Sequence, residues 1–278
     1  MKYLILPDVH NRWELAEKII KSVKPDKTIF LGDYFDDFGD DPGIIADVAD
    51  WFHHSVNQKN RIHLVGNHDT HYWFSGNRAL RCSGYEQFKC ISINDFVKKE
   101  DWEKLEWFHV LDNKWLLSHA GVHPNWIKPS TFKPDIISEI SLTTIKRRLK
   151  ADIIPAKEAF YANKMHWFAM PGFSRSDVSP YYGGLTWCDW TKEFYPIRGV
   201  HQLVGHTPCY DLTWIVVKQE GESFNALPLE EVSNPTLTDK NSYNLCLDSQ
   251  PGSKYYAIYE NGNLLVHKVP VDWRLPKN

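Results

Sequence analysis

The stretch that decides the fold is Gly66-Asn67-His68-Asp69, which directly follows the run Arg61-Ile62-His63-Leu64-Val65. The run has the length and composition of a buried strand, and we expect a polar loop after it. A carboxamide, an imidazole and a carboxylate are therefore presented together at the C-terminal end of a strand, where α/β sheets bind ligands. Alone, the tetrapeptide is weak evidence of a site, because Gly-Asn is also a common turn.

Two earlier strands end in the same way. Tyr3-Leu4-Ile5-Leu6 runs into Asp8-Val9-His10, and Lys27-Thr28-Ile29-Phe30-Leu31 runs into Gly32-Asp33-Tyr34-Phe35-Asp36. The strand-helix-strand order predicts a parallel unit, so these polar groups emerge at one sheet edge. Asp8 and His10 point the same way from an extended segment and can hold one metal ion, although a helix-capping loop explains that pair equally well.

Histidines follow two later strands. Lys114-Trp115-Leu116-Leu117 precedes Ser118-His119, and Gln202-Leu203-Val204 precedes Gly205-His206. A lone histidine is usually structural, so His119 and His206 are evidence for a site only in combination with the earlier blocks.

The remaining pattern predicts helices over about residues 11–23 with Asn11 as N-cap, 42–56, 101–108 and 136–149. Asn261-Gly262 predicts a hairpin. We expect the second half to be largely antiparallel and to form a second sheet packed on the first. Asp37, Asp40 and Asp41 are expected in a solvated loop. Residues 1–278 read as a single domain, with an insertion at about 122–199 that is either a lid or a peripheral subdomain.

Composition limits the function. The chain has 278 residues, 42% of them hydrophobic and 24% charged, with a net charge of -3. This charge provides no overall attraction to nucleic acid or an acidic membrane. Five cysteines without Cys-x-x-Cys spacing argue against a zinc knuckle or disulfide framework and favour a reducing compartment. Neither a signal peptide nor a membrane span is evident, so we expect a cytoplasmic protein of undefined oligomeric state.

The ordered blocks resemble those of the calcineurin-like metallophosphoesterase superfamily, from Tyr3 to about Pro208. The resemblance implies an α/β fold, a four-layer αββα sandwich of two mixed sheets flanked by helices. Gly205-His206-Thr207-Pro208 lacks the second histidine of the common Gly-His-x-His block. It is similar to the phosphoprotein phosphatase branch and its bacterial and phage relatives, which include dinucleoside-polyphosphate hydrolases.

Residue roles follow from this resemblance. Asp8, His10 and Asp33 would hold one metal ion, and Asp33, Asn67, His119 and His206 would hold a second. His68 would protonate the leaving group while Asp36 holds its ring. The metals would be two divalent ions among Mn, Fe, Zn and Co, with Mn favoured, because mixed Asp, His and Asn ligands suit these ions better than Ca.

The phosphate-binding arginines of that branch are missing here. Asp37 stands where the branch has one arginine, and Thr70-His71 where it often has another. Arg12, Arg78, Arg175 and Arg198 are candidate substitutes. We predict Arg12, His71 and Arg198 as substrate-binding residues.

The resulting prediction is a two-metal phosphoesterase that uses metal-bound hydroxide. Its substrate would be a phosphomonoester, as for a Ser/Thr phosphatase, or a nucleotide-type phosphoanhydride, carried by a small molecule, a nucleotide or a phosphoprotein. The alternatives are a phosphodiesterase or nuclease of the same superfamily, and a non-catalytic binding protein that keeps the fold.

Overall fold

The computed structural model describes residues 1–37, 39–129, 132–133, 136–219, 223–232, 241–249 and 254–274. Within these ranges the strands form two sheets, with five strands in the first and six in the second. The first sheet has the order β11 (Asn263–Lys268), β10 (Tyr255–Glu260), β1 (Lys2–Leu6), β2 (Lys27–Phe30) and β3 (Arg61–His63). The second has the order β4 (His109–Leu111), β5 (Trp115–Leu117), β6 (His201–Val204), β9 (Ser242–Cys246), β7 (Thr213–Val217) and β8 (Phe224–Pro228).

Apolar side chains from both sheets form the core between them. Ile5 and Ile29 point from the first sheet toward Trp115, Leu203 and Leu245 of the second, and all are fully or almost fully buried. The alternate residues of β1 face the other way, because successive side chains of a strand point to opposite faces. The two sheets therefore pack face to face.

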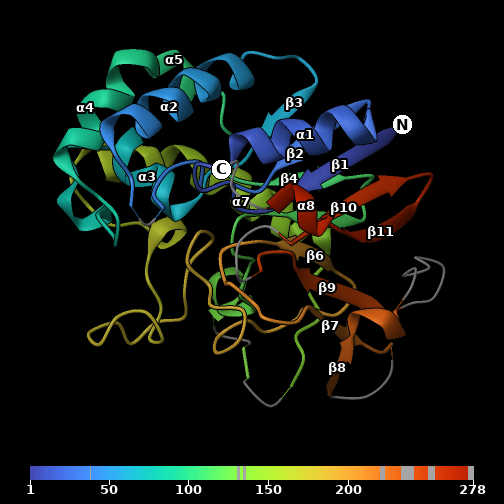
Figure 1. Cartoon of the computed structure of the whole chain (residues 1–278). Helices are drawn as coiled ribbons and strands as arrows, with labels where there is room; N and C mark the ends of the chain where they lie inside the picture. The colour runs from blue at the N-terminus through green and yellow to red at the C-terminus, as the bar shows by residue number, and fades with distance from the viewer. Residues whose placement is uncertain are drawn as a thin grey trace.

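Helices cover the outer faces of this pair of sheets (Figure 1). They are α1 (Trp13–Val23), α2 (Pro42–Val56), α3 (Asn67–Trp73), α4 (Gln87–Phe96), α5 (Lys99–Trp102), α6 (Pro124–Ile127), α7 (Leu142–Tyr161) and α8 (Val271–Arg274), with 3₁₀ turns η1 (Arg78–Leu80), η3 (Trp167–Ala169) and η4 (Leu229–Glu231). Ile19 of α1 and Ile45 of α2 pack against the outer face of the first sheet, in a cluster with Leu4 and Phe30. Leu116, on the outer face of β5, joins the same cluster as Ile145 of α7. The expected α/β fold of two mixed sheets flanked by helices is confirmed.

Several helix boundaries differ from the prediction. The polar segment after Gly66 is helix α3 and not a loop, because the Asp69 carboxylate accepts a hydrogen bond from Gly66 N at 2.7 Å and caps the helix. α1 begins at Trp13, and Asn11 donates instead to the Asp40 carboxylate. In place of a helix over 101–108, α5 ends at Trp102, and Glu106 forms a bridge with Leu64.

The helix predicted over 136–149 begins and ends later. Ser141 caps α7 by accepting a hydrogen bond from Thr144 N at 3.2 Å, and the helix runs to Tyr161. Ala156 and Phe160 in its second half are buried, so packing stabilises the helix beyond Pro155.

The second sheet is more parallel than expected, and the C-terminal hairpin is not part of it. β5, β6 and β9 pair in parallel, while β10 pairs antiparallel with β1 of the first sheet. The hairpin turn at Asn261-Gly262 is present, with Glu260 opposite Asn263. Pairing across more than 250 residues depends on the tertiary fold, which a local pattern does not encode.

Among the described residues, no helix combines the length and apolar character needed to cross a bilayer. Five strands, β1, β2, β3, β5 and β6, lead into the segments that carry the predicted metal ligands.

Candidate metal centre

The first group of metal-type ligands comes from the segments that follow β1 and β2. His10 Nε2 lies 3.9 Å from Asp8 Oδ2 and 3.8 Å from Asp33 Oδ2. Asp8 and Asp33 are almost fully buried, whereas His10 is partly exposed. These three side chains could hold one metal ion between them.

A second group shares Asp33 with the first. His119 Nε2 lies 3.3 Å from Asp33 Oδ2 and 3.0 Å from Asn67 Oδ1. His206 Nδ1 lies 2.8 Å from the same Asn67 oxygen, and all four side chains are buried. Asp33 therefore has the shared position that a carboxylate needs to bridge two cations.

The orientation of the imidazole rings fits bound cations. Nδ1 of His10 faces the Phe35 carbonyl at 3.0 Å, and Nδ1 of His119 faces the Leu31 carbonyl at 2.9 Å. Because a carbonyl only accepts, Nδ1 carries a proton in each ring, and Nε2, which faces the oxygens of the two groups, is the atom that would bind a cation. In His206, Nδ1 is the ring nitrogen that faces the second group, at 2.8 Å from Asn67 Oδ1. Ring nitrogens and oxygens directed at one another in a largely buried space suit divalent cations.

The charges of the two ligand groups also indicate a site for divalent cations. Burial and the nearby carboxylate of Asp248 raise the pKa of Asp8 well above its ordinary value. Burial alone would lower the pKa of His119, but the carboxylates of Asp33 and Asp8 raise it to about 9. Burial opposes ionisation of Asp33 as well, yet the charges of His119 and His68 hold its pKa well below the usual range. The buried carboxylates thus create a negative field that cations would neutralise.

Two glycines allow the loops to approach one another this closely. A Cβ atom at Gly66 would lie 2.0 Å from Asp33 Oδ1, and one at Gly205 would lie 2.1 Å from Asp8 Oδ1. Asp69 then fixes the loops, because its carboxylate accepts hydrogen bonds from the backbone nitrogens of Asp33 and Tyr34, each at 2.9 Å. This fastening role of Asp69 was not part of the sequence prediction, although the Gly66-x-x-Asp69 spacing of a helix cap is a signal for it.

Four predicted site residues have left-handed backbone conformations. They are His10, Asp33, Asp36 and His206, with φ of 40°, 51°, 67° and 70°. Such conformations cost free energy in residues other than glycine and cluster at functional sites.

His68 lies beside the first group, and Asp36 holds its ring. His68 Nδ1 is 3.0 Å from Asp36 Oδ2, and the rings of His68 and His10 meet edge to face with centroids 5.3 Å apart. Burial opposes protonation of His68, but the charge of Asp33 and the hydrogen bond with Asp36 raise its pKa well above the usual value. The other ring nitrogen of His68, Nε2, takes no part in the contact with Asp36.

Three side chains that the sequence did not link to Asp36 surround its carboxylate. Lys89 Nζ lies 3.1 Å from Oδ1, and Tyr72 donates to the same oxygen at 2.6 Å. His71 Nε2 lies 3.0 Å from Oδ2. His71, which we predicted as a substrate ligand, is fully buried in this position and has no exposed surface to offer a phosphate.

Cys82 lies next to the same histidines. Its Sγ is 3.3 Å from His71 Nδ1 and 3.8 Å from His68 Nδ1. Burial opposes ionisation of this thiol, but hydrogen bonds with both rings lower its pKa to about 7. Cys82 is 14 residues from His68 and 11 residues from His71 in the sequence, and no local motif indicates that the three side chains meet.

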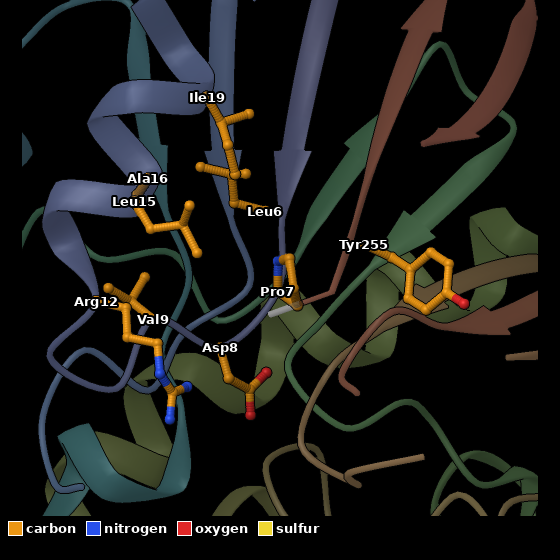
Figure 2. A pocket seen from close by; sticks show the side chains of 9 residues that line it. All are labelled: Leu6, Pro7, Asp8, Val9, Arg12, Leu15, Ala16, Ile19 and Tyr255. Atoms are coloured by element: carbon orange, nitrogen blue, oxygen red, sulfur yellow. The ribbon is translucent and has the colours of Figure 1, made fainter. Parts of the chain in front are cut away.

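The predicted phosphate ligand Arg12 lies near the first group and is paired with Asp37. Its Nη2 is 2.7 Å from Asp37 Oδ2, and both side chains are about one-third exposed, at 37% and 28%. Figure 2 shows Asp8 and Arg12 at the lower end of a small space whose upper walls are apolar side chains, including Leu15 and Ile19. Arg12 is therefore available to the metal centre from the β1–α1 loop.

The other arginines are placed differently. Arg198 precedes β6, at the end of that strand opposite His206, and its Nη1 donates to the Lys218 carbonyl at 2.9 Å. The structure thus does not bring Arg198 to the metal centre. Arg175 Nε is 2.8 Å from Asp189 Oδ2. Trp190, which follows Asp189, donates its backbone N–H to Thr207 Oγ1 at 2.9 Å, so the segment that holds Arg175 adjoins the loop of His206. Arg78 is exposed on η1.

The acidic loop is not simply solvated, as we had predicted. The side chain of Asp40 is only 4% exposed and lies 2.6 Å from Lys89 Nζ. Asp41 caps α2 by accepting from Gly43 N and Ile44 N at 2.7 and 3.0 Å. Local charge density does not reveal these partners, because Lys89 is distant in the sequence.

Comparisons with known proteins place this site in a family. Residues 1–210 match the calcineurin-like phosphoesterase family model. No curated protein matches the sequence.

Three solved structures are similar in outline. A candidate diadenosine tetraphosphatase is 13% identical with a TM-score of 0.45, over 96% of this chain and 93% of that one. A Saccharomyces cerevisiae serine/threonine phosphatase with similarity to human phosphatase PP5 has the same identity and TM-score, over 96% and 79%. The Escherichia coli phosphoesterase Yfce is 12% identical with a TM-score of 0.35, over 95% and 91%.

Identities and TM-scores this low carry nothing about the substrate of this chain. The family match, in contrast, covers most of the chain and includes every residue of both ligand groups. The chain therefore belongs to the calcineurin-like phosphoesterase family, whose members are metal-dependent phosphoester hydrolases.

Proposed function

We propose that this protein is a phosphatase that uses two divalent metal ions to hydrolyse a phosphomonoester or a nucleotide-type phosphoanhydride. The observation that carries the proposal is the sharing of Asp33 between two ligand groups, with the His68–Asp36 pair beside them. Asp8, His10 and Asp33 would hold one ion, and Asp33, Asn67, His119 and His206 the other. Mn is the favoured ion, because oxygen and imidazole ligands without sulfur suit it.

Bound there, two cations would neutralise the phosphate oxygens and make water acidic enough to attack at neutral pH. The side chains then supply what the cations do not. Asp36 fixes the ring of His68 through Nδ1, at 3.0 Å, so that Nε2 can give its proton to the departing oxygen. Asp36 itself is held by Lys89 and Tyr72 and stays ionised, which keeps His68 protonated.

Two arginines are proposed as phosphate ligands in place of those missing from the sequence motifs. Arg12 lines a groove together with His10, and Arg175 pairs with Asp189 in the segment that adjoins the His206 loop. Each is held by a carboxylate, Asp37 and Asp189 respectively, at 2.7 and 2.8 Å. One planar guanidinium group can bind two oxygens of the same phosphate. One arginine on each side of the metal centre would therefore orient the substrate.

A groove leads away from the centre at His10 and has room for the rest of a substrate. Its volume is about 900 Å³, and its walls include Arg12, Trp13, Asp37 and Trp273. This is the upper part of the size range of small-molecule sites. The proposed substrates are a phosphorylated small molecule, a nucleotide or a phosphoprotein segment.

The test is turnover of three compounds by protein loaded with Mn²⁺, with the Asp33→Asn variant as control. The compounds are p-nitrophenyl phosphate, bis-p-nitrophenyl phosphate and diadenosine tetraphosphate. Metal-dependent turnover of the first or the third by wild type, lost in the variant, would support the proposal. Turnover of the diester alone would replace it with a phosphodiesterase. No turnover with metal bound would indicate a binding protein and overturn it.

A further inference from the structure

Three metal-binding side chains meet beside His68, next to the second ligand group, where Asn67 Nδ2 lies 3.7 Å from Cys82 Sγ. They are His68, His71 and Cys82, and one ligand atom from each lies within 4.8 Å of the others. The thiol is at the centre, with its sulfur 3.3 Å from His71 Nδ1 and 3.8 Å from His68 Nδ1. The Asp33-centred groups contain no sulfur, so this cluster is chemically different from them.

The distances match a tetrahedral zinc site. Zn–S and Zn–N bonds of about 2.3 and 2.05 Å at a tetrahedral angle place sulfur and nitrogen roughly 3.5 Å apart. The observed separations, 3.3 and 3.8 Å, lie on either side of this value. Asp36 Oδ2 lies 3.0 Å from His68 Nδ1 and 3.0 Å from His71 Nε2 but outside the group of three, so it would hold both rings while water completes the tetrahedron.

Charge and access are also suitable. A thiolate and the Asp36 carboxylate with two neutral imidazoles balance a divalent cation. The nearby ammonium of Lys89 is balanced separately by Asp40, at 2.6 Å. Cys82 is partly exposed, and the side chain of His68 is 17% exposed, so an ion can reach the cluster from solvent.

We propose that His68, His71 and Cys82 form a third cation site that binds zinc-class soft divalent ions and inhibits the enzyme. A cation on His68 Nδ1 takes the place of the proton that this nitrogen shares with Asp36. His68 then remains as a metal-bound neutral imidazole, a weaker acid than imidazolium. A thiolate selects zinc or cobalt over manganese, so the site can fill while the Asp33 groups keep Mn²⁺. The inhibitory part of this proposal rests on the proposed function, whereas cation binding does not.

Binding is tested by optical titration of metal-free protein with Co²⁺, which reports thiolate ligation by a charge-transfer band in the near ultraviolet. Wild type should show the band and bind three Co²⁺ per chain, and Cys82→Ser should lose the band and bind two. Cys209→Ser is the matched control, because Cys209 is also partly exposed but lies outside the cluster, and it should keep the band. Absence of the band in wild type, or its persistence in Cys82→Ser, would overturn the site.

Inhibition is tested separately by adding Zn²⁺ to Mn²⁺-loaded protein during turnover. Cys82→Ser should need at least about tenfold more Zn²⁺ than wild type or Cys209→Ser for half inhibition, because one of the three principal ligands is gone. Equal sensitivity of all three proteins would overturn the inhibitory role. The Co²⁺ band does not require turnover, so failure of the proposed function would leave a positive binding result standing.

Discussion

Lys89 Nζ lies 3.1 Å from Asp36 Oδ1, and the lysine side chain is almost completely buried. It also lies 2.6 Å from Asp40, so one ammonium group ties α4 to the loop that carries Asp36. Tyr72 donates to the same Asp36 oxygen, which leaves Oδ2 directed at His68. Lys89 is therefore a positioning residue for the proposed proton donor, acting through Asp36.

Lys89→Met should weaken both the fold and the proton donation. Removing one partner of a buried ion pair leaves an uncompensated charge and costs about 3–5 kcal/mol of unfolding free energy. With Asp36 less well held, kcat for alkyl phosphates should fall more than kcat for p-nitrophenyl phosphate, whose leaving group hardly needs a proton. Steady-state kinetics on both substrates and urea unfolding measure these effects. Lys98→Met, at an exposed lysine, is the control. An equal fall on both substrates would show that Lys89 has only a structural role.

Asp33→Asn should lose more bound metal than Asp8→Asn or Asn67→Ala. Asp33 is the residue that both ligand groups share, so its replacement weakens two sites, whereas the other variants weaken one each. Elemental analysis of proteins purified with Mn²⁺ gives the occupancy. If Asp33→Asn holds as much metal as wild type, the bridging role is refuted.

His68→Asn should keep both metals but lose activity in a substrate-dependent way. His68 lies outside the Asp33-centred groups, and its Nδ1 is held by Asp36. Loss of a general acid typically costs about 10²–10⁴-fold, so kcat for alkyl phosphates should fall by this order. The loss should be much smaller for p-nitrophenyl phosphate. Metal lost together with activity would contradict the assignment of His68 as proton donor.

Asp37→Asn should lower KM for p-nitrophenyl phosphate, because it releases Arg12 from its 2.7 Å ion pair and removes a negative charge near the phosphate. Both side chains are partly exposed, so the effect should be modest, and it should shrink as salt screens the charges. KM measured at low and high ionic strength gives the result. Asp47→Asn removes a charge from the same groove without breaking the Arg12 ion pair and should change KM less. A KM unaffected by Asp37→Asn at low salt would leave Arg175 as the remaining arginine clamp.

The ligand-bearing strands could be predicted because their signals are local. Asp8, Asp33 and Asn67 each follow an apolar run within a few residues, and parallel pairing brings such positions to one edge. The groups around His68 could not be predicted in this way. Lys89 is 53 residues from Asp36, and its helix has no pattern that marks it as buried. Arg198 does not reach the metal centre because it precedes β6, whereas the ligand loops follow their strands. A residue before a strand lies at the opposite edge of the sheet from a residue after it.

The protein should lose stability as pH falls below about 6.5, in part because of His63. Burial, together with the charge of Arg61, lowers the pKa of His63 to about 3, from an ordinary value of 6.5. Its ring stacks on Phe30 with centroids 4.4 Å apart, and its Nε2 is 3.0 Å from Ser55 Oγ. Between these pKa values the unfolded chain binds a proton that the folded chain does not, so stability rises with pH in this window. The contribution is complete above pH 6.5 and is lost as pH falls.

His63→Gln should therefore flatten the pH dependence of unfolding. One proton taken up on unfolding costs about 1.4 kcal/mol per pH unit, so wild type should lose roughly 2 kcal/mol from this group between about pH 6.5 and pH 5. The glutamine variant should be less stable at pH 7.5, because it loses the stacking on Phe30, but it should lose less on acidification. Urea unfolding at several pH values measures both effects. His54→Gln, at an exposed histidine, should keep the wild-type slope. If His63→Gln kept that slope too, the acid-labile group would lie elsewhere, with the buried ring of His123, whose pKa burial also lowers to about 3, as the next residue to replace.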